Sequence, residues 1–104
     1  MSQFDVYENG NPDTRQTFPY LLDVQAEILD DIPTRVVVPL LKASLLKKAA
    51  PVLNPGFIIA SGKVFMFTAQ IAAVPVRVLG NRVCSLKDER NAIIAALDML
   101  FVGY

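Results

Sequence analysis

The sequence contains no histidine among its 104 residues. This absence removes the commonest general base of enzymes, the Ser-His and Cys-His dyads, and most zinc sites. The patterns GxxxxGK, GxGxxG, HExxH, CxxC and GxSxG, which are typical of phosphate, metal and nucleophile sites, are also missing. The chain therefore offers no candidate catalytic residues, and neither a metal nor a cofactor is expected.

Two weaker candidates for chemistry have simpler interpretations. Cys84 is the single cysteine, and without a histidine to act as its base we expect a buried structural thiol rather than a nucleophile. The acids Asp30 and Asp31 precede Pro33, a context that favours a solvated loop over a general acid/base pair.

No charge of one sign prevails. Ten Lys and Arg residues balance ten Asp and Glu residues, so no net field attracts nucleic acid or an anionic membrane. The N-terminus lacks the basic and apolar regions of a secretory signal, and no apolar run approaches the length of a membrane span. Together with the single cysteine, these features predict a soluble protein in a reduced, cytoplasmic compartment.

Hydrophobic residues make up 53% of the chain and charged residues only 19%. The chain can thus build a core, and its length fits one domain over residues 1–104. The apolar content exceeds the average of globular proteins. The excess indicates a partner surface, and a second copy of the chain is the simplest partner.

Alternating and β-branched runs predict strands over most of the chain, and a single helix follows them at the C-terminal end. In residues 20–25 the side chains of Asp23 and Gln25 fall on the polar, solvent-facing phase of a half-buried strand. Gly80 and Asn81 predict a turn. The expected strands are residues 4–7, 20–25, 34–41, 57–60, 63–68, 72–79 and 82–84, and the expected helix begins after Ser85 and ends before Gly103. The fold class is therefore α+β, mainly β, with an antiparallel sheet that can curl into a small barrel.

The end of the chain is unusually apolar. Helical spacing predicts an inward stripe that includes Phe101, whereas residues 102–104 lie beyond this stripe. Chain termini are usually polar and frayed, and the strongest single aromatic anchors contribute roughly 2 kcal/mol or more to an interface. We therefore predict that the helix end and tail contact a partner. The other members of the inward stripe are Ile93, Ile94, Leu97 and Leu100.

Five segments in this order resemble the CcdB family of toxins. They are residues 3–7 (QFDVY), 23–30 (DVQAEILD), 35–40 (RVVVPL), 73–76 (AVPV) and 96–104 (ALDMLFVGY). The resemblance implies an SH3-like antiparallel β-barrel with a small extra sheet and a C-terminal helix, assembled as a homodimer. It also implies a toxin without catalysis of its own, which binds the A subunit of DNA gyrase and traps the gyrase–DNA cleavage complex. A CcdA-like antitoxin would neutralise it, and the pair would repress its own operon, with operator DNA contacted only through the antitoxin.

The resemblance implies a set of gyrase-binding residues, and charge complementarity predicts a second set that binds the antitoxin in part. Both copies of a dimer would contribute the gyrase-binding set, which consists of Ile28, Leu29, Asp98, Phe101, Val102, Gly103 and Tyr104. Charge complementarity assigns the antitoxin's acidic, disorder-prone segment to the cations Arg15, Lys47 and Lys48.

The sequence departs from the family pattern at two of these positions. Val102 stands where plasmid toxins often have tryptophan, and Asp98 stands where they have asparagine. Stacking of the tryptophan against a gyrase arginine is therefore lost. Two other functions stay open: an mRNA endoribonuclease of the related MazF/Kid group, which would need a basic RNA-accepting groove, and a chromosomal CcdB homologue that has lost toxicity.

Overall fold

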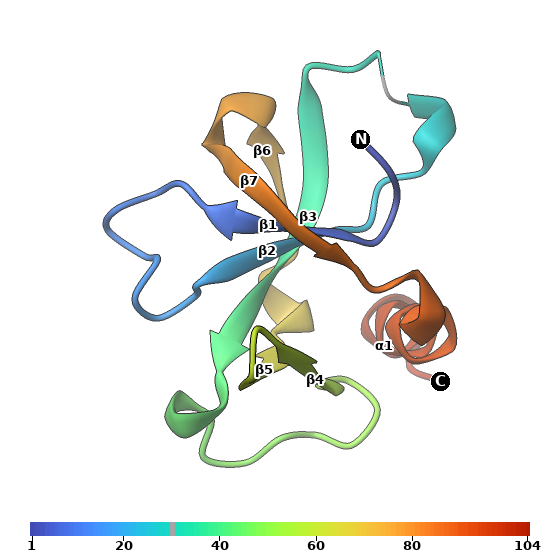
Figure 1. Ribbon diagram of the computed structural model, residues 1–104. Helices are drawn as coiled ribbons and strands as arrows, with labels where there is room; N and C mark the ends of the chain where they lie inside the picture. Colours follow the sequence, from blue (N-terminus) through green and yellow to red (C-terminus); the bar gives the residue numbers. More distant parts are fainter. Residues whose placement is uncertain (30) are drawn as a thin grey trace.

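The computed structural model describes residues 1–29 and 31–104. Figure 1 shows a curled antiparallel sheet with one helix packed beside it. This mostly β half-barrel with a single C-terminal helix confirms the predicted fold class. The described elements are β1 (Asp5–Asn9), β2 (Tyr20–Asp23), β3 (Thr34–Lys42), β4 (Gly56–Ile59), β5 (Gly62–Met66), β6 (Ala72–Pro75), β7 (Leu79–Ser85) and α1 (Arg90–Val102).

Strand β3 is the centre of the sheet. The strand order is β4-β5-β3-β2-β1-β7, and β6 pairs with the N-terminal half of β3 while β5 pairs with its C-terminal half. The β-branched run of β3 is buried on both faces, as its sequence predicts. The β4–β5 hairpin extends from the end of β3 and belongs to the same sheet as the other strands. Its two turn residues, Ala60 and Ser61, both have positive φ angles, 49° and 70°, as the tight turns of right-twisted hairpins require.

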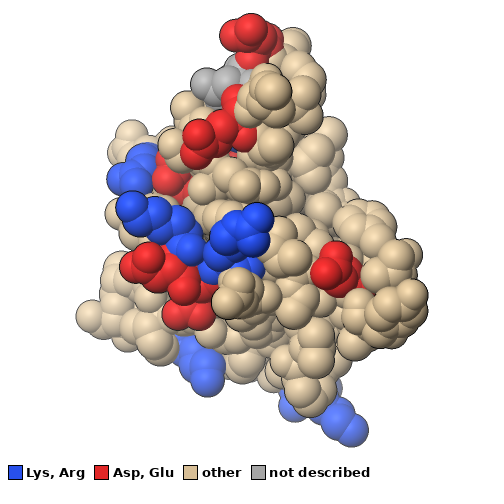
Figure 2. Space-filling view, turned by 90° about the vertical axis from the view of Figure 1, so that its right-hand side faces the viewer, with Lys and Arg blue, Asp and Glu red and all other residues tan. Residues whose placement is uncertain are grey.

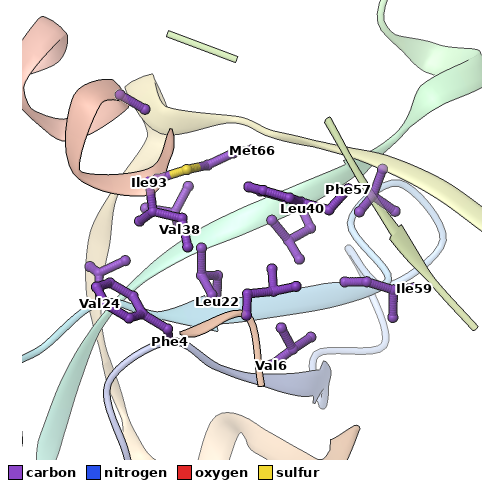
Figure 3. Close-up of a cluster of buried hydrophobic side chains, with 13 residues drawn as sticks. Phe4, Val6, Leu22, Val24, Val38, Leu40, Phe57, Ile59, Met66 and Ile93 are labelled. Carbon is purple, nitrogen blue, oxygen red and sulfur yellow. The ribbon is translucent and has the colours of Figure 1, made fainter. Parts of the chain in front are cut away.

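The core lies inside the curl of the sheet, where α1 closes it. In Figure 3, Ile93 of α1 points toward Met66 and Val38. Ile93 and Ala96 are fully buried, and complete burial of a side chain such as Ile93 stabilises the fold by about 1.5–3 kcal/mol. The other buried members of this cluster are Phe4, Val6, Leu22, Val24, Leu40, Phe57, Ile59, Val64 and Leu86.

The predicted turn at Gly80 and Asn81 is wrong. The chain turns earlier, at Val76–Val78, and β7 runs straight through both residues. A Cβ atom on Gly80 would lie 3.0 Å from the carbonyl oxygen of Glu8, so this glycine permits a close approach of β7 to the irregular part of β1. A glycine can serve either purpose, and sequence alone does not distinguish them.

Helix α1 is preceded by a 3-10 turn, Lys87–Glu89, that carries Asp88 and Glu89. These acids lie near the helix N-terminus, where negative charge interacts favourably with the helix dipole. Ser85 does not cap α1 itself; its hydroxyl accepts a hydrogen bond from the N–H of Lys87 at 3.2 Å. Within the described residues, no helix combines the length and the apolar character that a membrane crossing requires.

Candidate functional site

The C-terminal end of α1 carries uncovered apolar side chains. Phe101 is 69% exposed, Val102 59% and Tyr104 88%. The prediction that Phe101 belongs to the inward stripe is therefore wrong. The buried part of α1 is centred on Ile93 and Ala96, and the last turn extends past the core that these residues cover. Burial of an aromatic side chain is worth about 1.5–3 kcal/mol. Contact with a partner would therefore stabilise this end of the helix by burying these side chains.

Gly103 sets the direction in which the tail leaves the helix. Its φ angle is +84°, a left-handed conformation that side-chain-bearing residues rarely adopt. Its N–H donates to the carbonyl oxygens of Asp98 and Met99 at 3.2 and 3.1 Å, so the helix ends in a closed cap. Tyr104 therefore follows a defined turn.

The outward face of α1 is poor in charge. Asn91, Ala95, Asp98 and Val102 are exposed and recur at helical spacing, and Asp98 is the only charged residue from Asn91 to Tyr104. Figure 2 views the side of the molecule that carries α1; most of the Lys, Arg, Asp and Glu side chains lie on its left half, and the right half is largely uncharged. A purely solvent-facing helix would carry more charge on this face.

Ile28 and Leu29 form a second exposed apolar group. They lie in a 3-10 turn, Glu27–Leu29, that buries none of its three residues, and Ile28 is 91% exposed. Figure 1 places this turn and the C-terminus at opposite ends of one side of the molecule. Within one chain, the structure thus gathers Asp98, Phe101, Val102, Gly103 and Tyr104 at one site but does not bring Ile28 and Leu29 to it.

A buried ion pair lies at the base of the Ile28–Leu29 turn. The Nε and Nη2 atoms of Arg35 each lie 2.8 Å from Oδ2 of Asp23, and neither side chain is exposed. The other carboxylate oxygen of Asp23 accepts the N–H of Gln25 at 3.0 Å. Burial raises the pKa of Asp23 above its ordinary value, because the loss of hydration outweighs the hydrogen bonds from Arg35 and Gln25.

The prediction that Asp23 and Gln25 face solvent is wrong, because both side chains are buried. The sequence contains one signal for this arrangement. Arg35 directly precedes the apolar run of residues 36–41, and a cation next to such a buried run needs a buried partner. Among the described residues, no buried side-chain nitrogen or oxygen lacks a hydrogen bond.

Phe4 connects the buried ion pair to the start of the helix region. Its N–H donates to the carbonyl of Asp23 at 2.6 Å, and its own carbonyl accepts the N–H of Leu86 at 2.8 Å. Its φ angle of +72° is rare for a buried aromatic residue. The N-terminal segment therefore connects β2, which precedes the Ile28–Leu29 turn, with Leu86, which precedes α1.

The three predicted antitoxin-binding cations are exposed but do not lie on one element. Arg15 belongs to the loop between β1 and β2, and Lys47 and Lys48 belong to the segment between β3 and β4. Arg15 lines a surface hollow that adjoins a second one at Pro19 and Tyr20. Two further lysines, Lys42 and Lys63, line the second hollow.

The other candidates for chemistry form no catalytic arrangement. Cys84 is half-buried, and burial raises the pKa of its thiol, which leaves it less reactive. Asp31 is exposed, while Asp30 lies outside the described residues. In the described part of the chain, no three His, Cys, Asp or Glu side chains are grouped so as to hold a metal ion.

One family model matches residues 3–103, and its description is CcdB protein. The match covers almost all of the 104 residues, including the Ile28–Leu29 turn, the buried ion pair and the helix end. The strands-then-helix order and the apolar C-terminal end agree with the five segments that resemble this family. The chain therefore belongs to the CcdB family, the toxins of toxin–antitoxin modules.

Proposed function

We propose that this toxin acts as a homodimer that binds the A subunit of DNA gyrase and traps the gyrase–DNA cleavage complex in the bacterial cytoplasm. The toxin itself catalyses no reaction in this proposal. A CcdA-like antitoxin neutralises it, and the toxin–antitoxin complex represses its own operon through DNA contacts made by the antitoxin. Such modules serve plasmid maintenance when a plasmid encodes them.

The observation that carries the proposal is the exposed apolar end of α1. Phe101, Val102 and Tyr104 occupy the positions at which the family resemblance implies gyrase contact, and all three lie outside the core. Two exposed aromatic side chains at a capped helix end offer the kind of group that carries binding energy at an interface. A tail with a purely structural role would pack on its own sheet instead.

The separation of the two exposed groups supports the homodimer. Ile28 and Leu29 lie at the other end of the same side of one chain (Figure 1), so a two-fold axis across this side allows both copies to contribute to a single surface. Strand β6 is a candidate for the subunit interface, because Ala72 and Ala73 in the strand and Val76 directly after it are exposed apolar residues.

Val102 is the observation that favours a second candidate, a homologue that keeps the fold and the antitoxin but has lost toxicity. Valine offers no ring to stack against an arginine. The loss of a tryptophan anchor lowers affinity by several-fold to about a few hundredfold, at about 1.4 kcal/mol per factor of ten. Phe101 and Tyr104 remain to supply aromatic contacts.

Expression in a gyrase-dependent host, with and without the neighbouring antitoxin gene, tests the proposal. We expect growth arrest with the toxin alone, relief by the antitoxin, and accumulation of cleaved DNA when purified toxin is added to gyrase. A lack of growth arrest together with intact antitoxin binding would favour the non-toxic homologue. Specific RNA cuts at substoichiometric protein would instead identify a MazF/Kid-like endoribonuclease and overturn the proposal.

Charge reversal tests the antitoxin part of the proposal. Replacing Arg15, Lys47 and Lys48 by glutamate is expected to lower antitoxin affinity roughly tenfold or more at low salt, and less at high salt, because exposed charges are screened. Lys87→Glu is the matched control, since Lys87 is exposed near the start of α1 on the opposite side from the β1–β2 loop. Calorimetric titration at two salt concentrations measures the effect, and equal affinity of the triple variant and the control at low salt would refute it.

A further inference from the structure

We infer that Gln25 is a positioning residue that fixes the Ile28–Leu29 turn in the conformation presented to the target; the inference rests on the proposed function for its binding readout. Gln25 makes no contact with the target in this scheme. It acts by holding the backbone of the turn whose exposed side chains make that contact.

The side chain of Gln25 bridges the turn and strand β3. Its Nε2 donates to the carbonyl oxygen of Leu29 at 3.1 Å, and its Oε1 accepts the N–H of Val36 at 3.0 Å. Val36 belongs to the long central strand, and its carbonyl oxygen accepts the N–H of Val24 at 3.0 Å. One amide therefore fastens the end of the turn to the most firmly held strand of the sheet.

The backbone of Gln25 is also held by hydrogen bonds. Its N–H donates to Asp23 Oδ1 at 3.0 Å, and its carbonyl accepts a hydrogen bond from Nη2 of Arg35 at 3.2 Å. The buried ion pair thus grips both polar groups of the Gln25 backbone. Because the side chain of Gln25 starts from a fixed backbone, its hydrogen bond to Leu29 constrains the position of the turn relative to β3.

The described backbone gives the Glu27–Leu29 turn few hydrogen bonds of its own. Its own backbone bonds join Leu29 to Ala26 at 3.1 Å and Ile32 to Leu29 at 3.2 Å, and it buries none of its residues. A single 3-10 turn is marginal in water without tertiary contacts. Among the described residues, the amide of Gln25 is a side-chain contact that ties the end of this turn to β3, and its loss spreads the turn over several conformations of which only part can bind.

The experiment compares Gln25→Met with Asn54→Leu. Asn54 is a matched control because it is equally buried and its amide also bridges two backbone groups, Ala50 N–H and Met66 C=O, both at 3.0 Å. Both substitutions replace one bridging amide by an apolar side chain of similar length. We expect both to lower the unfolding midpoint, whereas only Gln25→Met lowers affinity for the purified A subunit of gyrase, by roughly five- to tenfold.

Two further readouts separate positioning from general destabilisation. Amide hydrogen exchange of Leu29 and Ile32 is expected to accelerate in Gln25→Met and not in Asn54→Leu, and this measurement needs no target. In an Ile28→Ala/Leu29→Ala background, Gln25→Met is expected to cause no additional loss of affinity, because the residues through which it acts are gone.

These outcomes decide the two proposals separately. If the wild-type chain fails to bind the gyrase protein, the proposed function fails, and hydrogen exchange still decides whether Gln25 holds the turn. Unchanged exchange at Leu29 and Ile32 in Gln25→Met would overturn the positioning role. An equal affinity loss in Asn54→Leu, or a full effect of Gln25→Met in the double-alanine background, would overturn it as well.

Discussion

Deletion of residues 102–104 is expected to leave the chain folded and to abolish its growth arrest. The three residues are exposed and contribute nothing to the buried cluster. The fold loses the last residue of α1 and the cap bonds of Gly103, and a net hydrogen bond is worth about 1 kcal/mol. The target surface, in contrast, loses Tyr104 and the fixed exit of the chain from the helix. Gyrase affinity is expected to fall by roughly a hundredfold or more, as removal of interface anchors of about 2 kcal/mol each implies.

Point substitutions refine this result. Phe101→Ser and Tyr104→Ser each remove an exposed aromatic ring and leave the length of the chain unchanged. Ile58→Ser is the control, because Ile58 is 67% exposed on the edge strand β4, outside the proposed site. Circular dichroism and thermal unfolding check the fold, while surface plasmon resonance with the gyrase protein measures binding. Full toxicity of the truncated chain would contradict the assignment of the tail, as would an equal loss in Ile58→Ser.

The order of strands and helix could be predicted from the sequence because the residue patterns that indicate each element are local. Strands β3, β4 and β5 contain β-branched and aromatic residues, which are enriched in strands. The C-terminal helix likewise follows from the spacing of Ile93 and its apolar neighbours. The prediction failed at Gly80, because the same residue permits either a turn or a close strand approach, and only the partner strand decides between them.

The site was predicted less completely, and the reason is tertiary. Exposure of Phe101 depends on where the core ends, which the helical period does not reveal. Burial of Asp23 and Gln25 depends on Arg35, which is ten or more residues away along the chain. Alternation alone assigns polar residues to solvent, and this assignment fails wherever a second strand supplies a matching charge.

Arg35→Met is expected to destabilise the protein by about 3–5 kcal/mol at neutral pH. The substitution nearly keeps side-chain volume but leaves the carboxylate of Asp23 without a cation at a site that has no solvent exposure, and broken buried ion pairs cost this much. The matched control is Arg82→Met. Arg82 pairs with Asp5 at 3.2 Å, but its side chain is 54% exposed, and the nearly buried Asp5 keeps hydrogen bonds from the Ser2 N–H and the Tyr7 hydroxyl, so the expected loss is much smaller than that of Arg35→Met. Urea unfolding of the three proteins measures both values.

The pH dependence of Arg35→Met provides an independent check. Burial already raises the pKa of Asp23 in the wild-type chain, although Arg35 opposes this effect, so removal of Arg35 raises it further. A carboxyl group whose pKa is higher in the folded state than in the unfolded state favours folding at low pH, and this contribution is lost as the pH rises through the folded-state pKa. The stability deficit of Arg35→Met relative to wild type is therefore expected to shrink as the pH falls from 7 toward about 4, near the ordinary pKa of aspartate. A deficit that stays constant over this range would mean that the unpaired Asp23 carboxylate is not its cause.

Arg35 also donates a hydrogen bond to the backbone carbonyl of Gln25. The same variant is therefore expected to loosen the Ile28–Leu29 turn, so that the stability of the buried ion pair is coupled to the conformation of this exposed turn.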